Sequence, residues 1–282
     1  MDYAGICISD LDGTLLPPNG KISATNLIML EELAQRGICR VLATGRSLFS
    51  MSKVVPIDAP FDYVIFATGA GIMDWKKQEL IYSQNLDAKQ ILRVCEVLED
   101  LKLDYMLHNS IPETHHIQYK SFGTNTDFTN RIDIYREFAT ELQHSETPSW
   151  DGATQFLTIV EHNRKDLYED LCTRLHPLTA IRTTSPLDFC SIWIEIFAPG
   201  VNKGEGIMRL LQIIGMSLRH CMVIGNDYND LHMLELCPFA YVTANAPQEL
   251  KDKFEVVASC DKDGFSAAVQ HWLSHFPAST SS

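Results

Sequence analysis

Positive charge, long apolar runs and paired cysteines are all scarce in this sequence of 282 residues. Lys and Arg number 23 against 36 Asp and Glu, which gives a net charge of −13 at pH 7. Such a surface repels nucleic acids and anionic membranes, so we expect neither as a partner. It also gives no long-range attraction for an anionic substrate, and any phosphate site must therefore be built locally.

No stretch approaches the roughly 18 apolar residues of a membrane span. The N-terminus opens with an acid and lacks the basic region of a secretory signal. The eight cysteines are scattered without a C-x-x-C pair, which favours buried, reduced thiols. The hydrophobic fraction of 45% and the charged fraction of 21% are close to globular averages. We therefore expect a folded cytoplasmic protein, and we expect it to be a monomer or a weak homo-oligomer.

Several short apolar runs end abruptly in polar groups, as buried parallel strands do. After the first run, Ser23 and Gly37 stand where the N-cap and the left-handed C-cap of a helix belong. A second helix is expected from Gly204 to about Ile214. This alternation predicts an α/β fold with a Rossmann-like parallel sheet covered by helices. The apolar runs are Tyr3 to Ser9, Ile38 to Ala43, Tyr63 to Ala67 and Cys221 to Ile224.

The middle of the chain has a different pattern. Leu86 to Leu101 has the spacing of an amphipathic helix, whereas Phe156 to Glu161 and Ser191 to Phe197 alternate like antiparallel strands. We therefore predict an α+β domain inserted at residues 85–198. The core domain is then formed by residues 1–84 and 199–282.

Polar residues follow the predicted parallel strands, where ligands bind in such sheets. Up to four carboxylates would meet at this edge, which is costly unless a cation, most simply Mg²⁺, neutralises them. Lys203 begins a predicted helix, where the helix dipole disfavours a cation, and this favours a role in the site. The residues after the strands are Asp10, Asp12, Thr44, Arg46, Thr68, Asn226, Asp227 and Asp230.

The pair Asp10-x-Asp12 suits phosphoryl transfer in two steps. Asp10 can attack phosphorus and form an aspartyl-phosphate. Asp12 can protonate the leaving alkoxide and then deprotonate the water of the second step. Thr44, Lys203 and Mg²⁺ would neutralise the phosphoryl oxygens as charge develops. We expect the substrate, a small phosphomonoester, to contact Thr14, Gly45, Arg46, Lys203 and Asn229, although pairing of Arg46 with a local acid is an equal alternative.

Four ordered motifs in this chain resemble those of the haloacid dehalogenase superfamily. They are Asp10-Leu11-Asp12-Gly13-Thr14-Leu15, Thr44-Gly45-Arg46, Asn202-Lys203-Gly204 and Gly225-Asn226-Asp227-Tyr228-Asn229-Asp230. The long insertion and the G-x-x-x-N-D-x-x-M-L form resemble the Cof-type sugar phosphatases with a large α/β cap. The resemblance implies that Asp10 is the nucleophile, Asp12 the acid/base whose main-chain carbonyl touches Mg²⁺, Thr44 and Lys203 the phosphate holders, and the fourth motif the source of the remaining metal ligands.

The fourth motif departs from the usual Gly-Asp-Gly-x-Asn-Asp, because Asn226 replaces the first metal carboxylate. An amide oxygen can ligate Mg²⁺ but brings no charge, so binding should be weaker. Asn226 is favoured as a direct ligand, because strand register fixes the residue after Gly225. Asp227 would support the site, or replace Asn226 after a small shift of the loop.

The leading hypothesis is a Mg²⁺-dependent phosphatase for small metabolites, most simply sugar phosphates. A phosphomutase and a non-catalytic phosphate-binding regulatory module are the alternatives. Asn226 is the only feature of the sequence that favours the regulatory module. The adjacent His115 and His116 are not expected to bind a metal, because neighbours on a strand point to opposite faces. Candidates for a sugar pocket in the insertion are His108, Asn109, Tyr119, Trp193 and Glu195.

Overall fold

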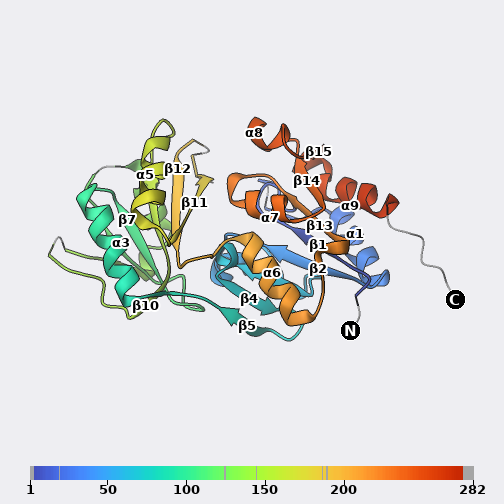
Figure 1. Cartoon of the computed structure of the whole chain (residues 1–282), viewed down its shortest axis with the longest axis horizontal. Helices are drawn as coiled ribbons and strands as arrows, with labels where there is room; N and C mark the ends of the chain where they lie inside the picture. Colours follow the sequence, from blue (N-terminus) through green and yellow to red (C-terminus); the bar gives the residue numbers. More distant parts are fainter. Residues whose placement is uncertain are drawn as a thin grey trace.

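The computed structural model describes residues 3–18, 20–123, 125–143, 145–185, 187–188 and 190–275. The chain forms two lobes that lie side by side (Figure 1). An eight-stranded sheet is the centre of one lobe, which we call the core, and a seven-stranded sheet is the centre of the other, which we call the cap. This arrangement confirms the predicted α/β fold with a parallel-sheet core.

The core sheet places the N-terminal strand at its middle. Its six strands from β15 to β3 are parallel, and β4 and β5 add an antiparallel hairpin at one edge. In spatial order the strands are β15 (Glu255–Val257), β14 (Phe239–Thr243), β13 (Cys221–Gly225), β1 (Gly5–Ser9), β2 (Ile38–Ala43), β3 (Tyr63–Phe66), β4 (Gly71–Asp74) and β5 (Glu79–Ser83).

Helices cover both faces of the core sheet, because successive side chains of its buried strands point to opposite faces. In β1, Cys7 belongs to the hydrophobic cluster on one face, and Ile6 and Ile8 belong to the cluster on the other. The first cluster includes residues of α1 (Ala24–Gln35), α2 (Leu48–Met51) and α9 (Gly264–Ser274), and the second includes residues of α6 (Lys203–Ile214), α7 (Leu231–Leu236) and α8 (Gln248–Lys251).

The helix ends agree with the signals in the sequence. The Ser23 side chain accepts a hydrogen bond from Asn26 N at 3.1 Å and caps α1, and Gly37 has a φ of 68° just beyond its end. Asn202 caps α6 by accepting a hydrogen bond from Glu205 N at 2.9 Å. Because this cap sets where α6 begins, Lys203 is its first residue.

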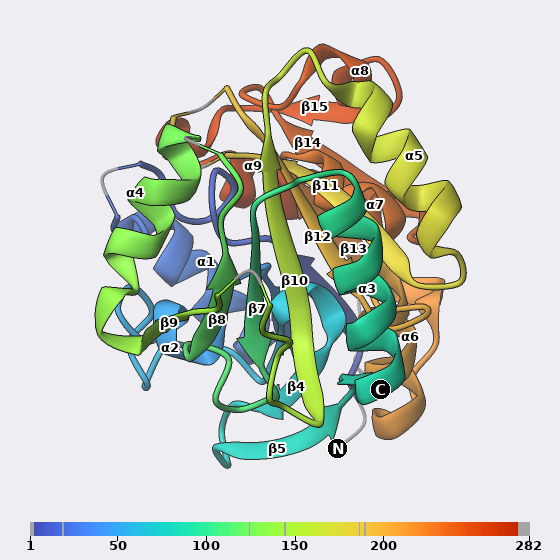
Figure 2. The ribbon, with the colours of Figure 1, turned by 90° about the vertical axis from the view of Figure 1, so that its left-hand side faces the viewer.

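The cap sheet is mainly antiparallel, and helices α3 (Ala88–Asp100) and α5 (Lys165–Leu175) pack on one of its faces (Figure 2). The other face carries a second apolar cluster, which includes Phe128 of α4 (Thr126–Ile134) and Phe49 of the core. In spatial order the strands are β11 (Thr179–Thr184), β12 (Ile192–Phe197), β10 (Gly152–Val160), β7 (Tyr105–Asn109), β8 (Ile117–Lys120) and β9 (Ala139–Glu141), and β6 (Leu86–Asp87) pairs with β10.

The chain passes from core to cap after β5 and returns after β12. These two connections lie together, because Gln84 Nε2 donates a hydrogen bond to the carbonyl oxygen of Pro199 at 2.9 Å. Along the sequence, the strands of the cap sheet occupy one continuous part of the chain, between the two halves of the core.

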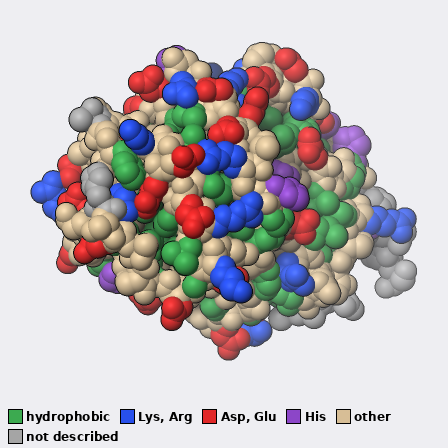
Figure 3. Space-filling view, turned by 60° about the vertical axis from the view of Figure 1, so that its left-hand side comes forward, with side chains coloured by type: hydrophobic (Ala, Val, Ile, Leu, Met, Phe, Trp, Pro, Cys, Tyr) green, Lys and Arg blue, Asp and Glu red, His purple; other side chains and the backbone are tan. Residues whose placement is uncertain are grey.

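The surface shows no gathering of positive charge in the view of Figure 3, where Lys and Arg side chains are interspersed with Asp and Glu. In the part of the chain that the structure describes, no helix has the length and apolar character needed to span a membrane. All eight cysteines are free and six are buried, as expected.

Candidate active site

Four parallel strands end at one edge of the core sheet, in the spatial order β13, β1, β2 and β3. The hydrogen bonding of the sheet continues one residue beyond the strands. Asp10 N donates to Ile224 O at 2.9 Å, and Thr44 N donates to Ile65 O at 2.8 Å. The structure thus brings Asp10 and Thr44 to the same edge, where the carboxyl ends of neighbouring parallel strands lie together.

Lys203 reaches this edge from the first turn of α6. Its Nζ lies 2.6 Å from Oδ1 of Asp10 and 2.6 Å from Oδ1 of Asp230, and its side chain is 0% exposed. Burial alone would lower the pKa of Lys203, but these two carboxylates outweigh burial and raise its pKa above the ordinary value. Lys203 is therefore a fixed positive charge between two acids.

Asp10 is buried at the centre of the group. Burial, and then the nearby carboxylate of Asp230, raise the pKa of Asp10 to about 7, although Lys203 opposes both effects. Acids perturbed by burial and by a charged neighbour are concentrated at functional sites. The electrostatics therefore single out Asp10 among the acids of this edge.

Asp230 lies at the end of the short helix η4 (Tyr228–Asp230) and ties the fourth motif to Lys203. Its Oδ2 accepts hydrogen bonds from the backbone N of Asn226 at 2.7 Å and of Asp227 at 3.1 Å. Its Oδ1 faces the Lys203 ammonium. The Asp230 carboxylate thus fixes the loop after β13 and helps to hold the lysine.

Asp12 is paired with Arg46. Arg46 Nε and Nη2 each donate to one carboxylate oxygen of Asp12 at 2.7 Å. Arg46 Nη1 also donates to Ser50 O at 3.2 Å, and its backbone N donates to Thr44 Oγ1 at 3.1 Å. Of the two alternatives for Arg46, the structure therefore shows pairing with a local acid, which positions the Asp12 carboxylate.

The Asn226 side chain lies against three oxygens of the first motif. One atom of its terminal amide is 3.1 Å from Asp10 Oδ2, 2.7 Å from the Asp12 carbonyl oxygen and 3.0 Å from Thr14 Oγ1. With nitrogen in that place, the amide donates to Asp10 and Asp12. With oxygen there, three oxygens face one another, which is the donor set that Mg²⁺ prefers.

This arrangement fits a magnesium ion when the amide oxygen of Asn226 faces Asp10 and Asp12. The ligands offered are a carboxylate oxygen of Asp10, the main-chain oxygen of Asp12 and the amide oxygen of Asn226. Only one of the three carries charge, so the set is weakly charged for a divalent cation.

Asp227 points to the cap. Its Oδ2 accepts hydrogen bonds from Thr183 Oγ1 at 2.8 Å and from Thr184 N at 2.9 Å, both on β11. Its Oδ1 accepts from Tyr228 N at 2.8 Å and from Thr184 Oγ1 at 3.3 Å. Asp227 therefore joins the fourth motif to the cap.

The remaining expected substrate contacts lie around the same edge. Thr14 is buried beside Asn226. A Cβ on Gly45 would lie 3.4 Å from Thr68 Oγ1 and 3.5 Å from Asn229 Nδ2, so these three residues are neighbours. Thr68 also donates its backbone N–H to Thr44 O at 3.1 Å.

A buried acid of the cap also reaches the edge of the core. Glu195 on β12 accepts hydrogen bonds from Thr68 Oγ1 at 3.2 Å and from Gln155 Nε2 at 3.0 Å. Glu195 is buried, and this burial raises its pKa above the ordinary value although both hydrogen bonds lower it. The cap therefore brings a buried acid to the end of β3.

The other four cap candidates differ in their surroundings. His108 is buried, its Nδ1 lies 2.9 Å from Thr114 O, and its Nε2 has no hydrogen-bond partner among the described residues. Trp193 donates its indole N–H to Asp127 at 2.7 Å. Asn109 accepts a hydrogen bond from Ser110 N at 2.7 Å, and Tyr119 is partly exposed on β8. Among the five, Glu195 is the residue that bonds to the core edge.

Two contacts between the lobes were not expected from the sequence. Thr183 and Thr184 bind the fourth motif through Asp227, and Phe49 of the core stacks on His115 of the cap, with ring centroids 4.5 Å apart. No local pattern marks these residues, since each contact depends on how the cap sits on the core.

Comparison with known proteins agrees with this geometry. Residues 7–269 match the family model of the haloacid dehalogenase-like hydrolases. An HMP-PP phosphatase of Yersinia pseudotuberculosis is 28% identical over 276 residues, which are 94% of this chain and 94% of that protein. An HMP-PP phosphatase of Yersinia pestis is 27% identical, with the same coverage.

Solved structures share the whole fold. A HAD subclass IIB sugar phosphatase matches with a TM-score of 0.76 and 19% identity, over 95% of this chain and 99% of that one. A HAD phosphatase from Bacteroides thetaiotaomicron matches with a TM-score of 0.74 and 18% identity, over 96% and 95% of the two chains. From the family match, the related phosphatases and the shared fold, we conclude that this chain belongs to the haloacid dehalogenase-like hydrolases, as a phosphatase with an inserted cap.

Proposed function

We propose that this protein is a Mg²⁺-dependent phosphatase of small phosphorylated metabolites, foremost sugar phosphates, that works through an aspartyl-phosphate. The observation that carries the proposal is the buried Asp10 carboxylate, held by Lys203 at 2.6 Å with Asp12 two residues further on. A nucleophile, a fixed positive charge and a second acid then lie at one strand end.

In the first step, the Asp10 carboxylate attacks phosphorus and the bond from phosphorus to the leaving oxygen breaks. Asp12 gives its proton to the leaving alkoxide. Arg46 donates to both Asp12 oxygens and so positions the ionised carboxylate, and one of these two hydrogen bonds must open when Asp12 carries the proton for this step. Thr44 and Lys203 hold the phosphoryl oxygens, and Thr14, Gly45 and Asn229 line the edge around them.

In the second step, Asp12 takes a proton from water, and the water oxygen attacks phosphorus. The bond between phosphorus and Asp10 breaks, which releases inorganic phosphate and restores the free carboxylate. Each proton that leaves Asp12 in the first step is therefore regained in the second. The enzyme ends in its starting state.

We assign the holding of Mg²⁺ to Asp10, the Asp12 carbonyl and Asn226, because one terminal amide atom of Asn226 lies 3.1 Å from Asp10 Oδ2 and 2.7 Å from the Asp12 carbonyl oxygen. The bound ion would add positive charge beside the phosphoryl group and help to stabilise the transition state. Asp230 acts through Lys203 and the loop amides, and Asp227 acts through the cap, so both support the metal site indirectly.

We propose residues 85–198 as the inserted cap that chooses the substrate. All the residues assigned to chemistry lie outside it, and among the five candidates for a sugar pocket Glu195 is the one bonded to the catalytic edge. A carboxylate here accepts hydrogen bonds, which suits the hydroxyl groups of a sugar. HMP-PP is a second candidate substrate, because the related Yersinia proteins are HMP-PP phosphatases. The free thiols suit action in the cytoplasm.

A screen of phosphorylated metabolites tests this proposal. Phosphate release from hexose phosphates and HMP-PP is measured with Mg²⁺ and with chelator, and Asp10→Asn serves as the control. We expect Mg²⁺-dependent release by the wild type alone. Turnover only with a bisphosphate activator would indicate a phosphomutase, and binding without any turnover would indicate a regulatory module.

A further inference from the structure

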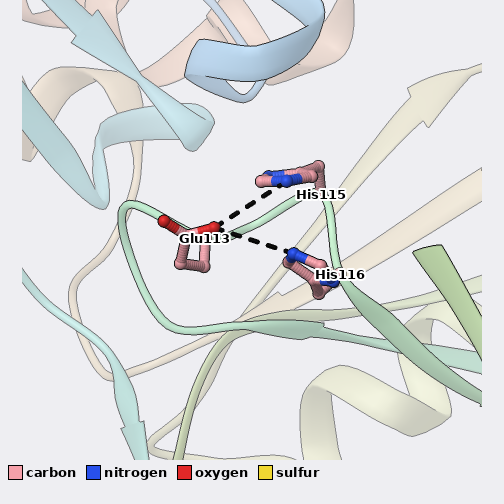
Figure 4. A group of neighbouring side chains, drawn as sticks. All are labelled: Glu113, His115 and His116. Atoms are coloured by element: carbon pink, nitrogen blue, oxygen red, sulfur yellow. Dashed lines mark ion pairs between the residues drawn. The ribbon is translucent and has the colours of Figure 1, made fainter.

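A second possible metal site lies in the cap, outside the residues assigned to chemistry. Glu113, His115 and His116 belong to the turn between β7 and β8, and one ligand atom of each lies within 4.8 Å of the others. The three side chains face a common point (Figure 4). The expectation that the two histidines point to opposite faces is wrong, because both precede β8 and their ring centroids are 4.4 Å apart.

The distances within this group suit a shared ion better than direct hydrogen bonds. Glu113 Oε2 is 3.8 Å from His115 Nε2 and 3.7 Å from His116 Nε2. Both distances exceed the roughly 2.7–3.2 Å of a nitrogen–oxygen hydrogen bond. Ligands about 2.0–2.1 Å from a tetrahedral zinc ion are separated by about 3.4 Å, so small side-chain rotations would bring the group together.

The turn that carries the group is already ordered by its own hydrogen bonds. Glu113 N donates to Ser110 O at 2.8 Å, His116 N donates to Glu113 O at 3.1 Å, and Asn109 N donates to His116 O at 2.9 Å. Little backbone freedom would therefore be lost when an ion binds, which favours affinity.

Ring contacts hold one of the proposed ligands, His115, in place. Phe49 stacks on the His115 ring at 4.5 Å, and Phe138 meets its edge at 4.9 Å, so the ring has a fixed orientation.

We propose that Glu113, His115 and His116 form a binding site for a zinc-class divalent ion, distinct from the Mg²⁺ site of the core. Two imidazole nitrogens and one carboxylate oxygen are a ligand set for Zn²⁺ or Co²⁺, whereas Mg²⁺ prefers oxygen alone. A water molecule would complete the tetrahedron. Because His115 stacks on Phe49 of the core, the ion would fix the cap where it touches the core.

The site is tested by titrating the whole protein with Zn²⁺ alone and measuring the heat of binding by calorimetry. The variants are His116→Ala and Glu113→Gln, whose side chains are 45% and 59% exposed, so neither should disturb folding. Changing a residue that only supports a ligand costs about 10-fold to 100-fold in affinity, so each variant should lose at least about 10-fold. His162→Ala, at an exposed histidine outside the group, is the matched control.

Any Zn²⁺ that binds at the catalytic edge would bind equally in all of these variants. A difference between the variants therefore reports only the Zn²⁺ ion bound by Glu113, His115 and His116. Co²⁺ gives a second readout, since the visible absorption of a tetrahedral site should appear in the wild type and in His162→Ala and disappear in His116→Ala. Equal Zn²⁺ affinity and stoichiometry in the wild type, His116→Ala and Glu113→Gln would overturn the proposal. It would do so whether or not the protein hydrolyses phosphate esters.

Discussion

The edge of the core that carries Asp10 and the face of the cap that carries Glu195 surround a buried acid with different groups. At the core edge, Lys203 lies between Asp10 and Asp230. On the cap, Glu195 accepts hydrogen bonds from two neutral groups, those of Gln155 and Thr68. In the proposed function, the opposite charges of the core bind the phosphoryl group of any substrate, whereas the hydrogen-bonding groups of the cap distinguish the molecules to which the phosphate is attached.

If the chemistry belongs to the core edge, the largest effect should come from Asp10→Asn. The change removes the nucleophile while keeping its volume, so we expect turnover to be lost and the urea unfolding midpoint to stay nearly the same. Steady-state phosphate release measures the first, and urea titration the second. A variant that keeps more than about a tenth of the wild-type rate, within about 1.4 kcal/mol of its barrier, would contradict the assignment.

The contact between the core edge and the cap can be weakened by changing Asp227. Asp227→Asn should weaken the contact with β11 by about 1.5–3 kcal/mol, the usual worth of a hydrogen bond to a charged group, and should raise KM more than it lowers kcat. Thr183→Val is the matched control, since it removes one of these bonds from the cap side.

The two variants separate the possible roles of Asp227. If it holds the cap, both should raise KM and leave the Mg²⁺ concentration for half-maximal activity unchanged. A higher Mg²⁺ requirement in Asp227→Asn but not in Thr183→Val would show instead that Asp227 binds the metal.

The charge balance of the core edge can be sharpened at Asn226. Asn226→Asp should tighten Mg²⁺ binding about 10-fold, or about 1.4 kcal/mol, because it adds a charged ligand. Without Mg²⁺ the same variant should melt at a lower temperature than the wild type, since it sets a carboxylate beside Asp10. Calorimetry and melting curves with and without Mg²⁺ measure both effects. If Asn226→Ala binds Mg²⁺ like the wild type, then Asn226 is not a ligand.

The smallest effect is expected at Glu195. Its raised pKa means that the folded protein holds a proton that the unfolded chain releases, so Glu195 costs stability progressively as the pH rises above the ordinary value of 4.5. As the pH rises through this range, the free energy of unfolding of Glu195→Gln should therefore increase relative to that of the wild type. The increase should be about 1.4 kcal/mol for each unit by which the pKa of Glu195 is raised.

Urea unfolding of the wild type and Glu195→Gln at several pH values between 4 and 8 measures this difference. Asp188→Asn is a control, because hydrogen bonds hold the pKa of that exposed cap acid low against the opposing effect of burial. A constant difference between the wild type and Glu195→Gln across the range would mean that Glu195 titrates normally in the folded state.

The same division explains what the sequence could reveal. The strands β1, β2 and β13 are apolar runs that end at motif residues, and parallel order alone brings their ends together, so the meeting of Asp10, Thr44 and Asn226 was predictable. Lys203 was predictable too, because its place at a helix start is unfavourable for a cation.

Contacts that depend on how the cap sits on the core were not predictable. Asp227 meets Thr183 across 44 residues of sequence, and no local pattern links them. The grouping of His115 with His116 was missed for a local reason, since a turn was interpreted as strand. The antiparallel hairpin of β4 and β5 was also missed, because its short strands lack a clear alternation.

The central claim, that the core edge carries the reaction through Asp10, is tested most directly by trapping the intermediate. With a substrate whose leaving group needs no proton, such as p-nitrophenyl phosphate, Asp12→Asn should still form the aspartyl-phosphate but hydrolyse it slowly, because the base for the second step is gone. Acid quenching of this variant during turnover, followed by peptide mass spectrometry, should place a phosphoryl group on Asp10. Phosphate release by the wild type with no phosphorylated Asp10 in the quenched variant, or with the label on another residue, would contradict the account.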